Sequence, residues 1–306
     1  MIKSDAILGV LFALFAAVGF SAKAILIKLA YLDHVDPITL LALRMAFSLP
    51  FFVFAAFWVN RGNHPPLKRQ DWIAVLMLGL AGYYLASFLD FLGLLYITAG
   101  LERLILFLYP TLTVVLSAII FKRQLGRKII AAMVLSYAGI VLVFFHDIDI
   151  SASNTAISRA DVILGSVLVF GSALSYSSYI VGAGHTISRI GATRFTAYAS
   201  IVACLACIFQ FAVTHPMSAL KLPVQVYVLS IAMAIFSTVL PVFFLSYAIH
   251  HIGSSRSSLI GSIGPVVTIY LAYLFLGEEV SLLQISGAIL VLAGVLTISL
   301  NSGKSK

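Results

Sequence analysis

Charged residues are scarce in this sequence, and their scarcity excludes most classes of soluble protein. Only 10% of the 306 residues are Asp, Glu, Lys or Arg, whereas 61% are hydrophobic and the mean hydropathy is +1.09. No polar segment is long enough to form a water-soluble domain. The strict alternation of apolar and polar residues expected in a membrane β-barrel strand is also absent. The composition therefore predicts an all-α membrane protein.

Cysteine and the common catalytic motifs are nearly absent as well. Cys204 and Cys207 have C-x-x-C spacing but lie inside an apolar stretch, without the solvent-accessible helix N-terminus of a redox motif. The adjacent His250 and His251 lack the spacing and further ligands of a metal site, and an interfacial or proton-sensing role is open to them. No G-x-x-x-x-G-K-[ST], H-E-x-x-H or G-x-S-x-G sequence is found. We therefore predict no cofactor, no metal, no ATP-driven pumping and no enzyme activity.

Ten apolar stretches occupy most of the chain. Each approaches the roughly 20 residues that a helix needs to cross a bilayer. The stretches are Ala6–Ala30, Pro37–Val59, Trp72–Tyr96, Ala99–Phe121, Ile129–Phe145, Val162–Ala183, Thr193–Val213, Val224–Ile249, Ser255–Leu276 and Leu282–Leu300. We expect ten transmembrane helices joined by short polar connections such as residues 60–70 and 145–159.

The basic residues indicate how these helices are oriented. With a cytoplasmic N-terminus, the outer loops hold only Arg159 and Lys221. The inner loops and tails then hold Lys3, Arg61, Lys68, Arg69, Lys122, Arg123, Arg127, Lys128, Arg189, Arg194, Arg256, Lys304 and Lys306. This asymmetry follows the positive-inside rule and places both termini in the cytoplasm. The net charge of +8 is therefore read as a topology signal, and no nucleic-acid partner is predicted.

The sequence also contains an internal repeat. Asp5-Ala6-Ile7-Leu8-Gly9 recurs as Asp161-Val162-Ile163-Leu164-Gly165, each at the start of an apolar stretch. A second ungapped match aligns nine positions at nearly the same offset, among them Pro110 with Pro265. Chance similarity between apolar segments explains some identities, but the prolines and the paired Asp-x-Ile-Leu-Gly starts favour duplication. Residues 1–150 and 151–306 are thus predicted to form two five-helix repeats.

Duplication of an odd number of helices has a geometric consequence. The second copy enters the membrane from the opposite face, so a pseudo-twofold axis lies in the membrane plane. Inverted repeats of this kind are typical of secondary transporters, whose substrate sites lie between the two halves. The pattern predicts a transporter that works by alternating access through a central cavity.

The late segment Leu274-Phe275-Leu276-Gly277-Glu278-Glu279-Val280-Ser281, followed by Gln284 and Gly287, resembles a known signature. Together with residues 41–47 (Leu-Ala-Leu-Arg-Met-Ala-Phe) and the five-plus-five pattern, it resembles the drug/metabolite transporter superfamily in its EamA-type branch. The overall pattern is most similar to bacterial YddG-like amino-acid exporters. The resemblance implies a multi-pass protein of the bacterial cytoplasmic (inner) membrane. The first repeat departs from the signature, with Phe121-Lys122-Arg123-Gln124 at the matching place.

Six charged residues remain within the predicted spans, all in the first repeat. They are Lys23, Lys28, Arg44, Asp90, Glu102 and Arg103. Each costs about 2.5 to 3.5 kcal/mol near a helix centre on insertion scales, so each needs a partner, water or a route to the interface. In a purely structural interpretation, Arg44 pairs with Asp90 or Glu102, while Lys28 and Arg103 reach outward.

These charges also bear on the substrate. Four cations against two carboxylates favour a carboxylate-bearing or zwitterionic solute over a lipophilic cation. An acidic residue deep in the first helix would be expected of a cationic-drug exchanger, and Lys23 stands there instead.

The resemblance implies that the first, third, fourth, sixth, eighth and ninth helices line the central cavity. Candidate substrate-binding residues near the midplane are Phe20, Lys23, Arg44, Tyr83, Tyr84, Ser87, Asp90, Tyr109, Tyr176, Tyr179, Ser237, Thr238, Phe243, Ser246 and Ser262. Aromatic walls with a few hydroxyls suit a small-ligand pocket, although the same residue types also serve ordinary helix packing. Pro110, Pro241, Gly264 and Pro265 are candidate hinges, with static kinks as the alternative.

The predicted function is export of small metabolites, in particular aromatic or neutral amino acids, by a secondary transporter. The alternatives are a proton-coupled efflux carrier for drugs or other metabolites, an intramembrane enzyme centred on Asp90 and Glu102, and a membrane subunit without transport. A small-molecule substrate and membrane lipids are the expected partners, and we expect a monomer.

Overall fold

The protein is helical throughout the residues that can be described. The structure is a computed structural model covering residues 2–61, 66–122, 124, 126–153, 158–252, 257 and 260–302. Side chains at positions 2–6, 146–153, 185, 246, 249, 250 and 298–302 lie outside this description, and with them Lys3 and His250. Within these ranges no strand is present, which confirms the all-α prediction.

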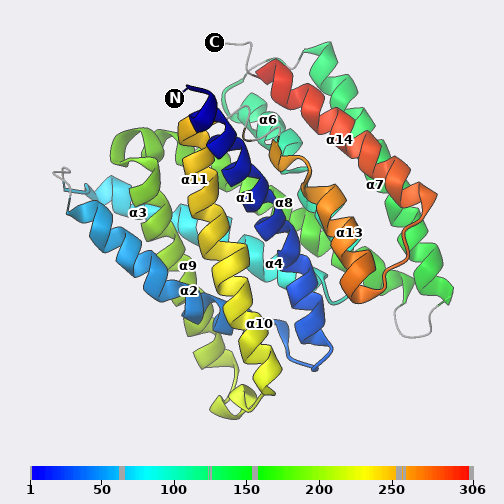
Figure 1. The fold of residues 1–306 in the computed structure, drawn as a ribbon, viewed down its shortest axis with the longest axis horizontal. Helices are drawn as coiled ribbons and strands as arrows, with labels where there is room; N and C mark the ends of the chain where they lie inside the picture. Colours follow the sequence, from blue (N-terminus) through cyan, green and yellow to red (C-terminus); the bar gives the residue numbers. More distant parts are fainter. Residues whose placement is uncertain are drawn as a thin grey trace.

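The helices of the first half are α1 (Ile2–Tyr31), α2 (Pro37–Asn60), α3 (Arg69–Gly79), the π-helical turn η1 (Leu80–Leu85), α4 (Ala86–Gly93), α5 (Ala99–Leu106), α6 (Tyr109–Ile120) and α7 (Arg127–Ser153). Those of the second half are α8 (Arg159–Ile190), α9 (Ala192–Thr214), the short 3-10 helix η2 (Met217–Leu220), α10 (Val224–Ala234), the π-helical turn η3 (Ile235–Val239), α11 (Leu240–Ile252), α13 (Gly264–Leu276) and α14 (Leu282–Ser302). Figure 1 shows the start of α1 and the end of α14 at the same end of the helical assembly.

Eight helical runs within the described residues are long and apolar enough to cross a membrane. Gly264–Leu276 and Leu282–Thr297 are shorter apolar helices. The chain is therefore a multi-pass membrane protein, while ten spans and cytoplasmic termini stay predictions. The expected polar connection over residues 145–159 is wrong in part, because α7 continues to Ser153 and α8 begins at Arg159. A helix that leaves the lipid keeps its backbone hydrogen bonds in water, so it need not end where the apolar residues end.

Local sequence explains where several helices begin. The Asp36 carboxylate accepts a hydrogen bond from the Thr39 backbone N–H (2.9 Å), and Pro37 follows at the first helical position of α2. At α8, Ser158 and Asp161 form a capping box in which each side chain bonds the backbone of the other. The repeated Asp-x-Ile-Leu-Gly sequence thus supplies, in its second copy, a helix-start signal.

Helical interruptions occur at matching places in the two halves. The turn η1 separates α3 from α4, and η3 separates α10 from α11 at the corresponding positions of the repeat. Pro110 lies in the first turn of α6 just after the break at residues 107–108, and Pro265 lies in the first turn of α13. Proline removes little helical hydrogen bonding there, because first-turn N–H groups have no partner inside the helix. The predicted interruptions are present, and movement about them stays a prediction.

Packing between helices follows a reciprocal pattern. Helix α1 packs against α11 and α13 of the second half, and its counterpart α8 packs against α4 and α6 of the first. The counterparts α2 and α9 pack against each other, as do α7 and α14, which Figure 1 shows side by side. Exchanging the two halves leaves this set of pairs unchanged.

Small residues allow the close approach of α7 and α14. A Cβ added at Gly139 would lie 2.5 Å from the Gly287 carbonyl oxygen, and one added at Gly294 would overlap the Ala132 carbonyl. Gly139 and Gly294 are aligned positions of the repeat, so the two contacts are counterparts of each other. Small residues of this kind are typical of tightly packed membrane helices.

Candidate functional site

A buried ionic cluster joins three helices of the first half. Lys23 Nζ of α1 donates to Asp90 Oδ2 of α4 at 2.5 Å and lies 3.5 Å from Glu102 Oε1 of α5. The side chains of Asp90 and Glu102 are only 2% and 0% exposed. Because an isolated buried carboxylate is strongly unfavourable, Lys23 is what allows both acids to remain inside. We name Lys23, Asp90, Glu102 and Arg44 the ionic cluster.

Arg44 of α2, the fourth member of the ionic cluster, contacts other residues than the carboxylates that we expected. Its Nε donates to Thr238 Oγ1 at 2.9 Å, and its guanidinium lies over the Phe91 ring, 5.4 Å from the centroid. The predicted ion pair of Arg44 with Asp90 or Glu102 is therefore wrong, because Lys23 holds both carboxylates. Thr238 lies within η3, so Arg44 connects the first half to the π-helical turn of the second.

Arg103 lies against the second half, while the prediction that it reaches the membrane interface stays a prediction. Its guanidinium lies against Gly264 of α13, where an added Cβ would be 2.8 Å from Arg103 Nη2. Gly264 also accepts a hydrogen bond on its carbonyl oxygen from Ser21 Oγ at 3.0 Å. The missing side chain at Gly264 makes room for the guanidinium between α5 and α13. Lys28, for which the same outward direction was predicted, is half-buried.

Several polar atoms of the ionic cluster are buried without a hydrogen-bond partner. They are Nη1 of Arg44, Oδ1 of Asp90 and both carboxylate oxygens of Glu102. Buried polar groups in folded proteins are nearly always hydrogen-bonded, so such atoms need an explanation. Their chemistry is complementary to a ligand that offers both a negative and a positive group.

Four of the predicted site residues form a second group, which we name the tyrosine cluster: Tyr83, Tyr109, Tyr176 and Tyr179. The Tyr179 hydroxyl donates to the Tyr83 hydroxyl at 3.2 Å. Ring centroids lie 5.0 Å apart for Tyr83 and Tyr179, 5.7 Å for Tyr176 and Tyr179, and 5.3 Å for Tyr109 and Tyr176. These rings pack against one another and fill the space between η1, α6 and α8.

The remaining candidates lie near one or other cluster or within the core. Tyr84 stacks on Phe88 with 6.2 Å between centroids, and Phe243 packs against Ala55 and Ala56. Phe20 and Ser87 are half-buried, whereas Ser237, Ser262 and Pro241 are buried. The side chain of Ser246 lies outside the described part of the structure.

Glu278 and Gln284, part of the EamA-type signature, have a structural role that the site prediction missed. Glu278 Oε1 accepts from the Ala99 backbone N–H at 2.9 Å, and Oε2 accepts from that of Gly100 at 3.4 Å. The second half thereby caps α5, the helix that carries Glu102. The buried Gln284 reaches the same place, since a Cβ at Gly100 would overlap its amide nitrogen. The resemblance of these residues to the EamA-type signature was the feature of the sequence that could have indicated their role.

Cys204 and Cys207 are buried in the core, as expected of packing residues. Across the described residues, no group of three or more His, Cys, Asp or Glu side chains is placed to hold a metal ion.

The comparisons with known proteins give a consistent family. The family model described as EamA-like transporter family matches residues 7–145 and again residues 163–300. A Bacillus subtilis (strain 168) protein called uncharacterized transporter YcbK is 30% identical over 312 residues, covering 99% of this chain and 97% of its own. The WAT1-related protein At1g68170 of Arabidopsis thaliana is 24% identical over 89% of this chain and 83% of its own.

A solved crystal structure shares the fold. It aligns with a TM-score of 0.65 and 18% identity, covering 97% of this chain and 98% of that one. With the family model matching nearly the whole chain in two copies, this protein belongs to the EamA-like transporter family.

Proposed function

We propose that this transporter exports small zwitterionic metabolites, specifically aromatic or neutral amino acids, across the bacterial cytoplasmic membrane by alternating access. The observation that carries the proposal is the ionic cluster with its unpartnered buried atoms. An α-carboxylate is the natural acceptor for Arg44 Nη1, and an α-ammonium is the natural donor for Asp90 Oδ1 and the oxygens of Glu102.

The surroundings of the cluster favour an aromatic or neutral side chain on the substrate. Phe91 lies beneath Arg44, and Tyr84 and Phe88 form a half-buried stack one to two turns earlier on the same helical run. Apolar and aromatic walls around a few fixed polar groups are usual in small-molecule sites. A cationic substrate side chain would meet Lys23 and Arg44, which disfavours basic amino acids.

Alternating access is supported by the reciprocal packing of the two halves. A set of helix pairs that survives exchange of the halves is what a pseudo-twofold axis produces. Since each repeat is predicted to hold five spans, that axis would lie in the membrane plane. The π-helical turns η1 and η3 occur at matching positions, and π-helical turns are frequent at functional sites. They offer one deformable point in each half.

Transport by the purified full-length protein in proteoliposomes tests this proposal. We expect radiolabelled phenylalanine to exchange across the membrane. Unlabelled phenethylamine and 3-phenylpropionate, which each lack one charged group, should compete poorly. Arg44→Gln should weaken competition by phenylalanine about tenfold or more, because a hydrogen bond to a charged group contributes about 1.5–3 kcal/mol. Lys221→Gln, at an exposed position outside the cluster, is the matched control.

Equal competition by phenethylamine would contradict the zwitterion site, and absence of flux for every amino acid would contradict the substrate class. Either outcome leaves the family membership unchanged.

Proton-coupled efflux is a second candidate, favoured by one specific observation. Asp90 and Glu102 face a single ammonium group, that of Lys23, within hydrogen-bond or ion-pair distance. One of two buried carboxylates beside a single cation can carry a proton, and that proton can be released when substrate binds. Flux measured with an imposed pH step and again after the gradient is collapsed separates the candidates. Identical rates exclude obligatory proton coupling.

A further inference from the structure

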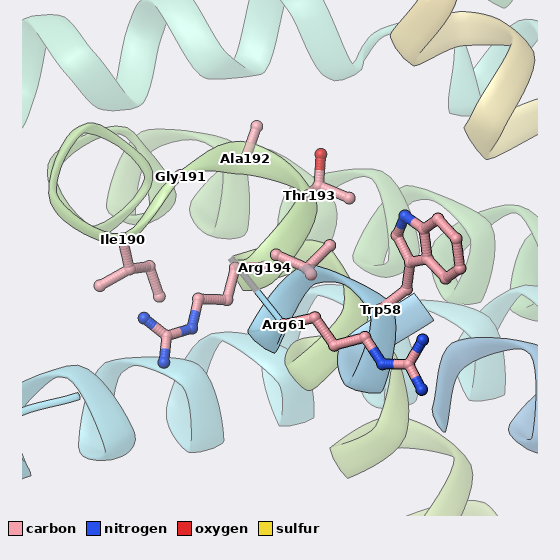
Figure 2. A pocket seen from close by; sticks show the side chains of 8 residues that line it. Trp58, Arg61, Ile190, Gly191, Ala192, Thr193 and Arg194 are labelled. Carbon is pink, nitrogen blue, oxygen red and sulfur yellow. The ribbon is translucent and has the colours of Figure 1, made fainter. Parts of the chain in front are cut away.

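Two adjoining pockets lie at one end of the helical assembly, away from the ionic cluster. The first, of about 550 Å³, is lined by Trp58, Val59 and Arg61 at the end of α2 and by residues 190–194 between α8 and α9. The second, of about 460 Å³, is lined by Pro66, Lys68, Asp71, Arg189, Ile190, Gly191 and Arg194. Both include Ile190, Gly191 and Arg194, so they form one continuous basin, part of which Figure 2 shows.

The lining of this basin is strongly basic. Arg61, Lys68, Arg189 and Arg194 line it, with Asp71 as the only acidic residue among the described lining side chains. Asp71 is already engaged, since its Oδ1 lies 2.8 Å from Arg189 Nη2 in an ion pair and the Lys68 backbone N–H donates to its Oδ2 at 2.9 Å. The described lining thus carries four cationic side chains and one carboxylate. The positive-inside rule explains basic residues at this membrane side, but it does not explain their convergence on one basin.

The start of α9 adds to the positive potential. Gly191 has φ +86°, which turns the chain sharply from α8 into α9, and no described side chain caps the new helix. The first backbone bond of α9 runs from the Phe195 N–H to the Gly191 carbonyl at 3.1 Å. The N–H groups of Ala192 to Arg194 precede it, and these residues line the basin. The N-terminus of a 23-residue helix thus faces the same space as the cationic side chains.

The basin opens beside a lipid-facing aromatic surface. Phe54, Phe57 and Trp58 on the last turns of α2 are 63%, 58% and 62% exposed. The Arg61 guanidinium lies over the Phe57 ring at 4.7 Å and over Trp58 at 6.0 Å. In Figure 2, the Arg61 and Trp58 side chains lie next to each other at the edge of the basin. Exposed aromatic rings next to an arginine are typical of the membrane–water interface.

From this arrangement we propose that the basin binds the phosphate head group of an anionic phospholipid. Arg61, Lys68 and Arg194 with the start of α9 hold the phosphate, while the acyl chains lie along Phe54, Phe57 and Trp58 of α2. A soluble phosphate ion would meet the same cations but would gain nothing from the aromatic surface. Since α2 and α3 belong to the first half and α8 and α9 to the second, the bound lipid connects the two halves at this end of the molecule.

The test compares lipid binding by the full-length protein and two double variants. Purified protein is titrated with short-chain phosphatidylglycerol, with short-chain phosphatidylcholine and with inorganic phosphate, and binding is measured by native mass spectrometry and by thermal shift. The first variant, Arg61→Gln with Lys68→Gln, removes two exposed cations of the basin. The matched control, Arg127→Gln with Lys128→Gln, removes two exposed cations from the same predicted membrane side outside the basin.

We expect phosphatidylglycerol to bind the native chain. Its affinity should fall about tenfold or more in the basin variant, since each cation near an anionic lipid contributes about 1 kcal/mol. The affinity of the control variant should be unchanged. Thermal unfolding without lipid should be alike in both variants, because the removed side chains are exposed. Equal losses in the two variants would overturn the proposal in favour of a diffuse charge effect. Inorganic phosphate that binds or competes as well as the lipid would overturn it in favour of a soluble-anion site.

Discussion

The ionic cluster and the tyrosine cluster share one pair of aligned repeat positions but have different chemistry. When the Asp5 and Asp161 segments are aligned, Tyr179 is the counterpart of Lys23. The later alignment around the prolines makes Ser257 the counterpart of Glu102. The ions lie on α1, α2, α4 and α5 of the first half, whereas the tyrosines lie on η1 and α6 of the first half and on α8 of the second.

This difference indicates separate roles for the two clusters. The tyrosine rings pack against one another, and the Tyr179 hydroxyl donates a hydrogen bond to that of Tyr83, so the cluster is held together by its own contacts. The ionic cluster retains buried atoms without partners, including Arg44 Nη1 and Asp90 Oδ1, and so is suited to receive a ligand. In the proposed function, the ionic cluster binds the substrate and the tyrosine cluster contributes packing, because function depends on side chains and not on the fold.

The largest effect is expected from removing the cation that holds both acids. Lys23→Met leaves Asp90 and Glu102 buried without a counter-charge, which should cost about 3–5 kcal/mol of stability. We expect a large fall in the thermal unfolding midpoint in detergent. Adding Asp90→Asn to Lys23→Met should restore part of that loss. If the single variant unfolds like the native chain, the ionic cluster is not a stabilising unit.

Arg44→Lys should have a smaller effect on stability and a larger one on transport. The ammonium keeps the charge but loses the planar donor set that reaches Thr238 Oγ1 and presents Nη1. We expect about tenfold weaker substrate binding, since a lost hydrogen bond to a charged group costs about 1.5–3 kcal/mol, and a smaller fall in unfolding temperature than in Lys23→Met. Thr238→Val should produce part of the same defect. Native transport by Arg44→Lys would contradict a carboxylate site at Nη1.

Gly264→Ala probes the contact of Arg103 with α13. The new Cβ would lie 2.8 Å from Arg103 Nη2, so the guanidinium, the flexible end of its side chain, must move away from α13. The matched control is Gly261→Ala, where an added Cβ meets nothing within 4 Å. Unfolding midpoints and transport rates of the two variants should differ, with only Gly264→Ala impaired. Equal behaviour would show that Arg103 does not depend on the space at Gly264.

The smallest effect is expected in the tyrosine cluster. Tyr179→Phe keeps the ring contacts and removes the hydroxyl, with its 3.2 Å bond to the Tyr83 hydroxyl and its bond with Thr196, which should cost about 1 kcal/mol. Tyr179→Ala, which removes the ring, should cost several times more. A Tyr179→Phe variant with wholly abolished transport would show that this hydroxyl serves substrate binding, and the contrast between the two clusters would fail.

Much of the fold could be predicted because the membrane restricts the choices. Lipid admits only helices with internally paired backbones, so apolar stretches of sufficient length are readable as spans. Pro110 and Pro265 could be assigned to interruptions because proline lacks an N–H group. The π-helical turn η1 had no such signal, since Leu80–Leu85 contains neither proline nor a helix-capping pattern, whereas η3 is closely followed by Pro241 in α11.

The sequence predicted which charged residues belong to the candidate site better than it predicted which of them contact one another. Lys23, Arg44 and Asp90 stand out as charges in apolar surroundings, and all three are buried or partly buried together. Which cation meets which acid depends on helix rotation and tilt, and the expected partner of Arg44 was wrong for that reason. The capping of α5 by Glu278 joins positions far apart in the chain, and spacing alone gives no hint of such a contact.

The sequence by itself determined that this chain is a helical membrane protein with a repeated half, since hydropathy and repetition are local properties of the chain. Only the tertiary structure decided that Lys23 holds both carboxylates, that Arg44 bonds to η3, and that basic residues of α2 and of the α8–α9 turn share one basin. Those contacts arise from the relative rotation of packed helices, which depends on side-chain interlocking across the whole assembly.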